Sequence, residues 1–238
     1  MRVLSFIMQG RFAHFCIPYT NVYRLTQPCL TKTAIMGFVG AVLGLYKDDL
    51  SLYQKIQCGI EIYCQYRTVS MPYLIRKGFP GSSANKESSR TSVEVIVRPK
   101  YRVFIASKHD DILFSIQRLM YQRESIFTPY LGLAQFVAST DFEVSTVVEG
   151  DLIEGVDVEV NGVFIREFHG ELDFERLNRV LKENIYRITE FEGLKNIKPI
   201  RNFEHATFTV NLDAESVPLK SVKNVLKITA WNKYVPIF

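Results

Sequence analysis

The sequence predicts an α+β protein: a ferredoxin-like (RRM-like) βαββαβ domain over residues 1–149, with a basic excursion at about 68–92, followed by a small β-rich extension over residues 150–238. Two patterns predict this fold. Short segments with alternating apolar residues are typical of strands, and longer ones with a period near 3.6 are typical of helices. Their order is strand, helix, strand, strand, helix, strand, which is that of a split βαβ unit. Hydrophobic residues make up 47% and charged residues 23% of the 238, which excludes a disordered chain.

The first strand is expected in the apolar run at residues 3–8, and the first helix at residues 33–46. This helix is apolar on nearly every face and contains Gly37, Gly40 and Gly44. Three glycines would destabilise an exposed helix by ~1 kcal/mol each, so we expect it to be buried, with close packing at Gly40 and Gly44. The helix is expected to be capped by a threonine, either Thr31 or Thr33.

The second and third strands are expected at residues 56–68 and 93–106, where apolar residues alternate, with a disturbance at Pro99. Between them, residues 78–90 are rich in Gly, Ser and Pro and predict a flexible, exposed excursion. Loops of this length within a compact domain are often functional.

The second helix is expected at residues 110–122, where apolar residues follow helical spacing and two acids occupy the first turn. A turn at residues 128–132 and a fourth strand at residues 142–148 complete the domain. In the extension, Asn161-Gly162 predicts a hairpin over residues 158–165. A helix at 172–186 and strands at 205–212 and 227–231 are also expected.

Charge is unevenly distributed along the chain. Residues 65–109 hold nine Lys or Arg against two acids, whereas residues 141–176 hold eleven acids against two Arg. The basic segment indicates a localised site for a polyanion, the alternative being a solvated loop beside an acidic face.

Cysteine and histidine patterns argue against a metal site. The four cysteines lack tight ligand pairs, so we expect reduced thiols, no metal and no cofactor. The histidines are scattered, and His14, His169 and His205 are interpreted as structural.

The sequence also lacks the common nucleotide-binding and nucleophile motifs. The glycines at 37–44 match neither a dinucleotide fingerprint nor a P-loop, and no serine lies in a nucleophile elbow. The longest apolar stretch has 13 residues and a membrane span needs about 20, so a soluble, cytoplasmic protein is expected.

Three segments together resemble a known family. Residues 28–44 read PCLTKTAIMGFVGAVLG, residues 127–136 read FTPYLGLAQF and residues 10–15 read GRFAHF. In their order along the chain, 10–15, 28–44 and 127–136, they resemble the fifth Cas family of the RAMP superfamily, whose members are subunits of type I CRISPR Cascade complexes. The resemblance spans about residues 1–138.

The resemblance implies a noncatalytic subunit, in the cytoplasm of a bacterium or archaeon, that holds the 5′ handle of CRISPR RNA. Its implied partners are the Cascade backbone (Cas-seven) subunit, the large subunit and, through the complex, target DNA. A thumb at about residues 68–92 would fold over the RNA and offer Tyr73 and Phe79 for base stacking or for packing against a neighbouring subunit. The residues expected to bind RNA are Lys32, Arg67, Arg76, Lys77, Lys86, Arg90, Lys108 and His109.

Two alternatives stay open. A nuclease branch of the family has a Lys-His pair where this chain has Lys108-His109, and cuts precursor CRISPR RNA without metal. That branch also uses a Tyr at the position of Leu43, and Tyr46 lies one turn further on. Under this alternative, Lys108, His109 and Tyr46 form a metal-independent endoribonuclease site. The third interpretation is an architectural RAMP subunit with little RNA contact.

Overall fold

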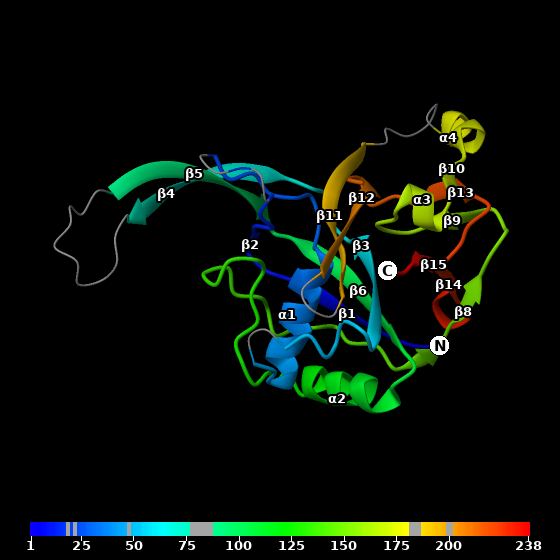
Figure 1. Cartoon of the computed structure of the whole chain (residues 1–238), viewed down its shortest axis with the longest axis horizontal. Coiled ribbons are helices and arrows are strands. Elements are labelled where there is room, and N and C mark those ends of the chain that lie inside the picture. The colour runs from blue at the N-terminus through cyan, green and yellow to red at the C-terminus, as the bar shows by residue number, and fades with distance from the viewer. Residues whose placement is uncertain (18–19, 21–22, 47–48, 77–87, 181–186, 199–201) are drawn as a thin grey trace.

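The computed structural model describes residues 1–17, 20, 23–46, 49–76, 88–180, 187–198 and 202–238 (Figure 1). Strands dominate this mixed fold. Among the described helices, none is long and apolar enough to cross a membrane.

The centre of the molecule is an antiparallel sheet with the strand order β3-β6-β1-β7. Its members are β1 (Arg2–Gln9), β3 (Ile56–Ile62), β6 (Lys100–Ser107) and β7 (Val148–Glu149). Strand β1 pairs with β6 along its whole length, and β3 covers the other edge of β6. The expected first strand is therefore confirmed, and it is buried because it lies inside the sheet.

The helices α1 (Lys32–Leu43) and α2 (Asp110–Tyr121) pack on one face of this sheet. Side chains alternate along a strand, so Leu4 and Phe6 lie in one hydrophobic cluster and Val3 in another. The Phe6 ring stacks at 6.0 Å on Phe38 of α1. On the opposite face, Val3 and its neighbours pack against the C-terminal strands.

Helix α1 begins and ends at identifiable signals. The Thr31 hydroxyl accepts a hydrogen bond from the Ala34 amide, which confirms the threonine cap. Gly44 ends the helix in the left-handed region at φ +77, earlier than residue 46. A side chain on Gly44 would collide with Ile126, whereas one on Gly40 would meet Leu45 at an ordinary 3.7 Å. Close packing is therefore a property of Gly44, and its expectation at Gly40 is wrong.

The basic excursion expected at about 68–92 includes both strands of a β-hairpin, and most of the segment expected to be flexible, residues 78–87, lies outside the described residues. Strands β4 (Thr68–Arg76) and β5 (Ser88–Val97) pair along their length and project from the body of the molecule (Figure 1). The short β2 (Phe12–Ala13) joins the other edge of β5, near the base of the hairpin. The expected third strand is divided at Arg98, whose φ of 49 separates β5 from β6.

The fourth strand is shorter than expected. Only Val148 and Glu149 pair regularly with β1. Upstream, the chain still follows β1, since Ile7 donates to the Phe142 carbonyl at 2.6 Å and Ser145 donates to the Ser5 carbonyl at 2.8 Å. The Ser5 amide, however, donates to the Ser145 hydroxyl. A side chain thus replaces the backbone in the ladder, and regular pairing is lost.

The C-terminal segment forms small sheets of order β10-β13-β9 and β15-β14-β8, and a separate β11-β12 hairpin. Its elements are β8 (Asp151–Ile153), β9 (Val158–Val160), α3 (Arg166–His169), β10 (Glu171–Leu172), α4 (Phe174–Val180), β11 (Ile188–Lys198), β12 (Asn202–Asn211), β13 (Val217–Lys220), β14 (Val225–Ile228), the 3₁₀ turn η2 (Thr229–Trp231) and β15 (Lys233–Pro236).

The hairpin expected at residues 158–165 is wrong. Strand β9 pairs with β13 instead. After the turn, the Val163 amide donates to the Ile60 carbonyl at 2.8 Å. Gly162, at φ +113, approaches that same carbonyl so closely that no side chain would fit. The Asn-Gly turn therefore directs the chain onto β3 rather than back onto β9. Of the helix expected at 172–186, α4 covers Phe174–Val180, and residues 181–186 lie outside the described part.

The two parts of the chain share one core. Val163, Phe208 and Phe238 belong to the same hydrophobic cluster as α1 and the central sheet. The ammonium of Lys233 also lies 2.6 Å from both carboxylate oxygens of Glu61 on β3. The division into two domains at residue 149 stays a prediction.

Candidate functional site

Two hollows lie beside the first turn of α1, and the β11-β12 hairpin contributes to both. The first, here called the basic cleft, has a volume of about 780 Å³. Among the described residues that line it, Glu204 has the one acidic side chain, and Phe238 carries the C-terminal carboxylate. Its basic residues are Lys32, Lys55, Lys108, Lys195 and His109.

Lys32 is the buried cation of the basic cleft. It is the first residue of α1 and is only 3% exposed. Within the described chain its ammonium forms no ion pair or hydrogen bond. Burial lowers its pKa, and the charge of Lys195 lowers it further, while Cys58 and Glu204 raise it. Because a helix N-terminus also carries partial positive charge, Lys32 lies where an anion would be strongly favoured.

The other cations of the cleft are held differently. The Lys195 ammonium lies 3.7 Å from the centroid of the Phe168 ring and 3.5 Å from the Glu204 carboxylate. Lys108 and His109 are exposed. His109 precedes α2, and its side chain makes no capping hydrogen bond. The fold thus brings together Lys32, Lys108 and His109, three of the expected site residues.

Tyr46 lies elsewhere. It follows the C-terminal end of α1, whereas Lys32 begins the helix, and twelve helical residues span about 18 Å. Tyr46 is 83% exposed, and its ring lies 6.4 Å from that of Phe127. Leu43 packs against the hydrophobic core. Tyr46 does not line the cleft that holds Lys108 and His109.

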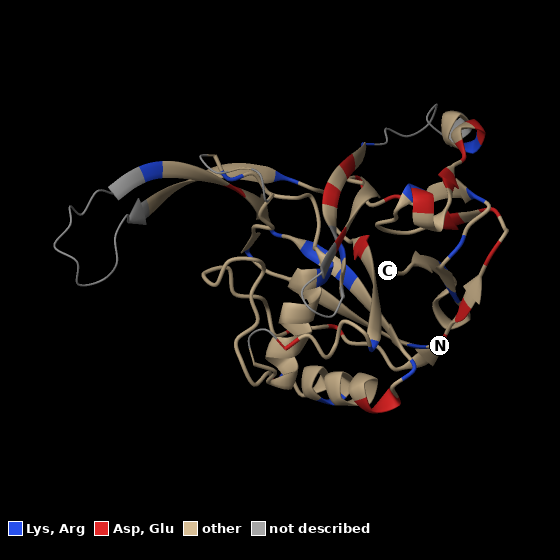
Figure 2. Cartoon of the chain, in the orientation of Figure 1, with Lys and Arg blue, Asp and Glu red and all other residues tan. Residues whose placement is uncertain are grey.

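The remaining expected residues belong to the β4-β5 hairpin or its base. Arg67 is exposed, and its guanidinium donates to the Gln65 side chain at 2.7 and 3.2 Å. Arg90 is exposed on β5, and Arg76 is the last residue of β4. Figure 2 shows basic residues along this hairpin and acidic residues gathered in the C-terminal segment. Tyr73 is 38% exposed on β4. Lys77, Phe79 and Lys86 lie outside the described residues.

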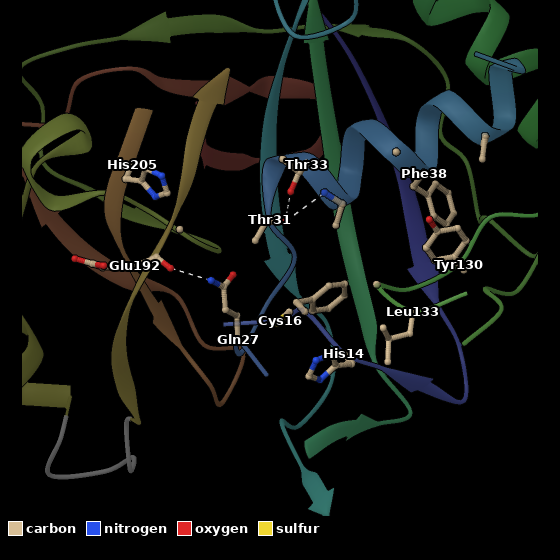
Figure 3. A pocket seen from close by; sticks show the side chains of 16 residues that line it. His14, Cys16, Gln27, Thr31, Thr33, Phe38, Tyr130, Leu133, Glu192 and His205 are labelled. Carbon is tan, nitrogen blue, oxygen red and sulfur yellow. Dashed lines mark hydrogen bonds between the residues drawn. The ribbon is translucent and has the colours of Figure 1, made fainter. Parts of the chain in front are cut away.

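The second hollow, here called the apolar pocket, has a volume of about 770 Å³ (Figure 3). All three segments that carry the family resemblance meet at it: residues 10–15, 28–44 and 127–136. Figure 3 shows Glu192 and His205 of the hairpin on one side of the pocket and Phe38, Tyr130 and Leu133 on the other. The described residues that line it include no lysine or arginine.

Two buried polar side chains border the apolar pocket. His14 is 1% exposed and donates from Nδ1 to the Glu94 carbonyl at 2.8 Å. Burial lowers its pKa, so the ring is neutral and Nε2 is a bare acceptor. Gln27 is 2% exposed, and its Nε2 donates to the Glu192 carbonyl at 2.8 Å. That carbonyl can only accept, which leaves the Gln27 Oε1 free.

Neither His14 Nε2 nor Gln27 Oε1 has a hydrogen-bond partner in the described chain. A buried polar atom without a partner costs about 1–3 kcal/mol. The sequence pattern did not point to either residue, because nothing in their local spacing reveals that they line a shared pocket.

Comparison with known proteins gives a likeness of fold. No family model and no curated protein matches the sequence. Among solved structures, a CRISPR protein from Archaeoglobus fulgidus matches 100% of this chain and 99% of its own, with a TM-score of 0.58 at 11% identity. A chain of a CRISPR RNA-guided surveillance complex matches over 92% of this chain and 91% of its own, with a TM-score of 0.54 at 14% identity. The chain therefore shares the fold of CRISPR-associated proteins.

Proposed function

We propose that this chain is a noncatalytic Cascade subunit of the fifth Cas family that binds the 5′ handle of CRISPR RNA in the basic cleft. The fold shared with the CRISPR-associated structures supports this proposal, as does the meeting of the three family-like segments at one pocket. The observation that carries it is Lys32, which is buried, has no ion pair within the described chain and shares with Lys195 a cleft that Glu204 alone lines with an acidic side chain among the described residues.

The negative charge of an RNA phosphate complements the positive charge of this cleft. It would stabilise the charged form of Lys32, and the partial positive charge at the N-terminus of α1 would attract it. Lys55, Lys108 and His109 line the rim and extend the basic surface along an RNA backbone. Each neutralised phosphate releases counterions, so binding weakens as salt rises.

The β4-β5 hairpin is the proposed thumb. It projects from the body and has Arg67 at its base and Arg90 and Tyr73 along its length. Basic and aromatic side chains together suit single-stranded RNA, since the former bind phosphates and the latter stack on bases.

The proposed subunit assembles with the Cascade backbone (Cas-seven) and large subunits in the cytoplasm and reaches target DNA only through the complex. Its core is proposed to be ferredoxin-like. The sheet order β3-β6-β1-β7 supports this, with α1 between β1 and β3 and α2 between β6 and β7.

Co-purification tests the proposal. The protein is expressed with a CRISPR array and the bound RNA is sequenced. We expect RNAs whose 5′ ends derive from the repeat, and we expect Lys32→Met with Lys195→Met to lose them while the exposed control Lys227→Met retains them. Recovery of unselected cellular RNA, or of no RNA, from the wild-type protein would contradict the proposal.

A further inference from the structure

Two buried residues that line the apolar pocket, His14 and Gln27, each have a hydrogen-bond acceptor that no donor of the described chain reaches. The Glu192 carbonyl fixes the orientation of the Gln27 amide, and the Glu94 carbonyl fixes the tautomer of His14. Gln27 Oε1 and His14 Nε2 are left unpaired. Both residues are at least 98% buried and both line the pocket. Such atoms are unfavourable unless a ligand supplies N–H or O–H donors.

The walls of the pocket define the rest of that ligand. Phe15, Phe38 and Tyr130 line it, together with the small residues Ala34 and Gly37. A volume of about 770 Å³ lies within the range of pockets that hold small molecules. Aromatic walls favour a flat, apolar ring system, and the absence of lysine and arginine among the described lining residues disfavours a phosphate.

The pocket is also adjacent to the basic cleft. Thr31 and Thr33 line the pocket, whereas Lys32 between them lines the cleft. On β11, Glu192 and Gly193 face the pocket and Lys195 faces the cleft. An RNA strand with a phosphate beside Lys32 can therefore place a neighbouring base in the apolar pocket.

We propose that the apolar pocket holds one unstacked nucleobase carrying an exocyclic amino group, which donates to Gln27 Oε1 or His14 Nε2. Adenine, cytosine and guanine have such a group and uracil lacks it. This inference rests on the proposed function, because RNA bound in the basic cleft supplies the base.

The test uses seven-nucleotide RNAs, UUUXUUU, in which X is adenosine, purine riboside or uridine. Purine riboside keeps the purine ring and lacks the amino group. By fluorescence anisotropy at fixed salt, we expect adenosine to bind about 3- to 10-fold more tightly than purine riboside, the worth of about one hydrogen bond. In Gln27→Met, which removes the acceptor at similar volume, this difference should shrink.

A second variant fills the pocket without disturbing the core. Gly37 lies in α1, and a Cβ built on it meets nothing within 4 Å. Gly37→Leu should place its side chain in the pocket and abolish the preference for adenosine. Gly37→Ala is the matched control, since it gains helix propensity in the same way but leaves the pocket open. Melting temperatures verify that all variants are folded.

Equal binding of adenosine and purine riboside RNAs to the wild-type protein overturns the inference, and this comparison needs no mutation. An adenosine preference that survives Gly37→Leu also overturns it. Gly37→Leu that leaves RNA binding intact but prevents assembly with another subunit would assign the pocket to a protein side chain. Failure of a repeat-derived handle RNA to bind in the same assay contradicts the proposed function itself, whereas equal binding of the UUUXUUU RNAs contradicts only this inference.

Discussion

The side-chain amide of Gln27 donates a 2.8 Å hydrogen bond to the backbone carbonyl of Glu192, 165 residues later in the chain. This bond ties the segment before α1 to the β11-β12 hairpin. The hairpin in turn lines the basic cleft through Lys195 and the apolar pocket through Glu192. One long-range contact thus helps to hold the wall shared by the two candidate sites.

Two constraints favour glycine at position 132: its left-handed backbone conformation and the lack of space for a side chain. It lies at φ +86 in the turn that borders the apolar pocket, and a Cβ there would collide with the His14 carbonyl. Gly155, at φ +71, has open space around it. Both alanine variants incur the left-handed strain, so we expect Gly132→Ala to be less stable than Gly155→Ala by about 1–3 kcal/mol in urea unfolding. Equal destabilisation would mean that the turn yields to the added methyl group.

Acid should destabilise the fold through His169. It is fully buried, its Nδ1 accepts from the Ile165 amide at 2.9 Å, and its Nε2 donates to the Ile237 carbonyl at 3.0 Å. Burial lowers its pKa to about 4. The unfolded chain takes up this proton near pH 6.5 and the folded chain only near pH 4. Stability is therefore lost as pH falls through this window, by roughly 3 kcal/mol in total.

Urea unfolding between pH 7.5 and 4.5 measures this effect. His169→Gln should flatten the pH dependence of the unfolding free energy, whatever its effect on stability at pH 7.5. His205→Gln, at an exposed position, is the control and should keep the wild-type slope. The same slope in wild-type protein and in His169→Gln would contradict the assignment.

The thumb should contribute to the salt dependence of RNA binding. Replacing Arg76, Lys77, Lys86 and Arg90 together removes up to four phosphate contacts, each worth about 0.7 in the slope of log affinity against log salt. Replacing the exposed Lys223 and Lys227 is the control. We expect only the hairpin variant to show a flatter slope in binding of repeat-derived RNA. If both variants retain the wild-type slope, the thumb assignment is wrong.

Precursor RNA should not be cut. Lys108 and His109 lie at the basic cleft, but Tyr46 lies beyond the other end of α1. Loss of a positioned acid–base group typically reduces the rate by about a hundredfold or more. Incubation of the protein with precursor repeat RNA in EDTA should therefore leave the RNA intact. Cleavage at the boundary of the 5′ handle that disappears in His109→Ala would establish the endoribonuclease alternative.

The sequence predicted those elements that are determined by residues close together in the chain. Helix α2 follows its apolar period, and α1 begins at a threonine cap. Strand β4 was missed because Val69 and Leu74 are exposed and Pro72 interrupts the pattern, which an edge strand tolerates. The turn at Gly162 was misassigned because its partner, Ile60, is distant in sequence.

The candidate site was predictable only in part for the same reason. Charge and family resemblance pointed to Lys32, Lys108 and His109 separately, and tertiary structure brings them to one cleft. Lys195 and Gln27 carry no local signal, because their environments depend on how the β11-β12 hairpin packs beside α1.

The most direct test of the account measures the affinity for a repeat-derived handle RNA across a salt series, by fluorescence anisotropy. Three proteins are compared: the wild type, Lys32→Met with Lys195→Met, and the exposed control Lys227→Met. If the two cleft lysines neutralise phosphates, the double variant binds more weakly at low salt, and its slope is flatter by about 0.7 for each lost contact. The control should match the wild type. A folded double variant with the wild-type affinity and slope would contradict the assignment of the basic cleft as the RNA site.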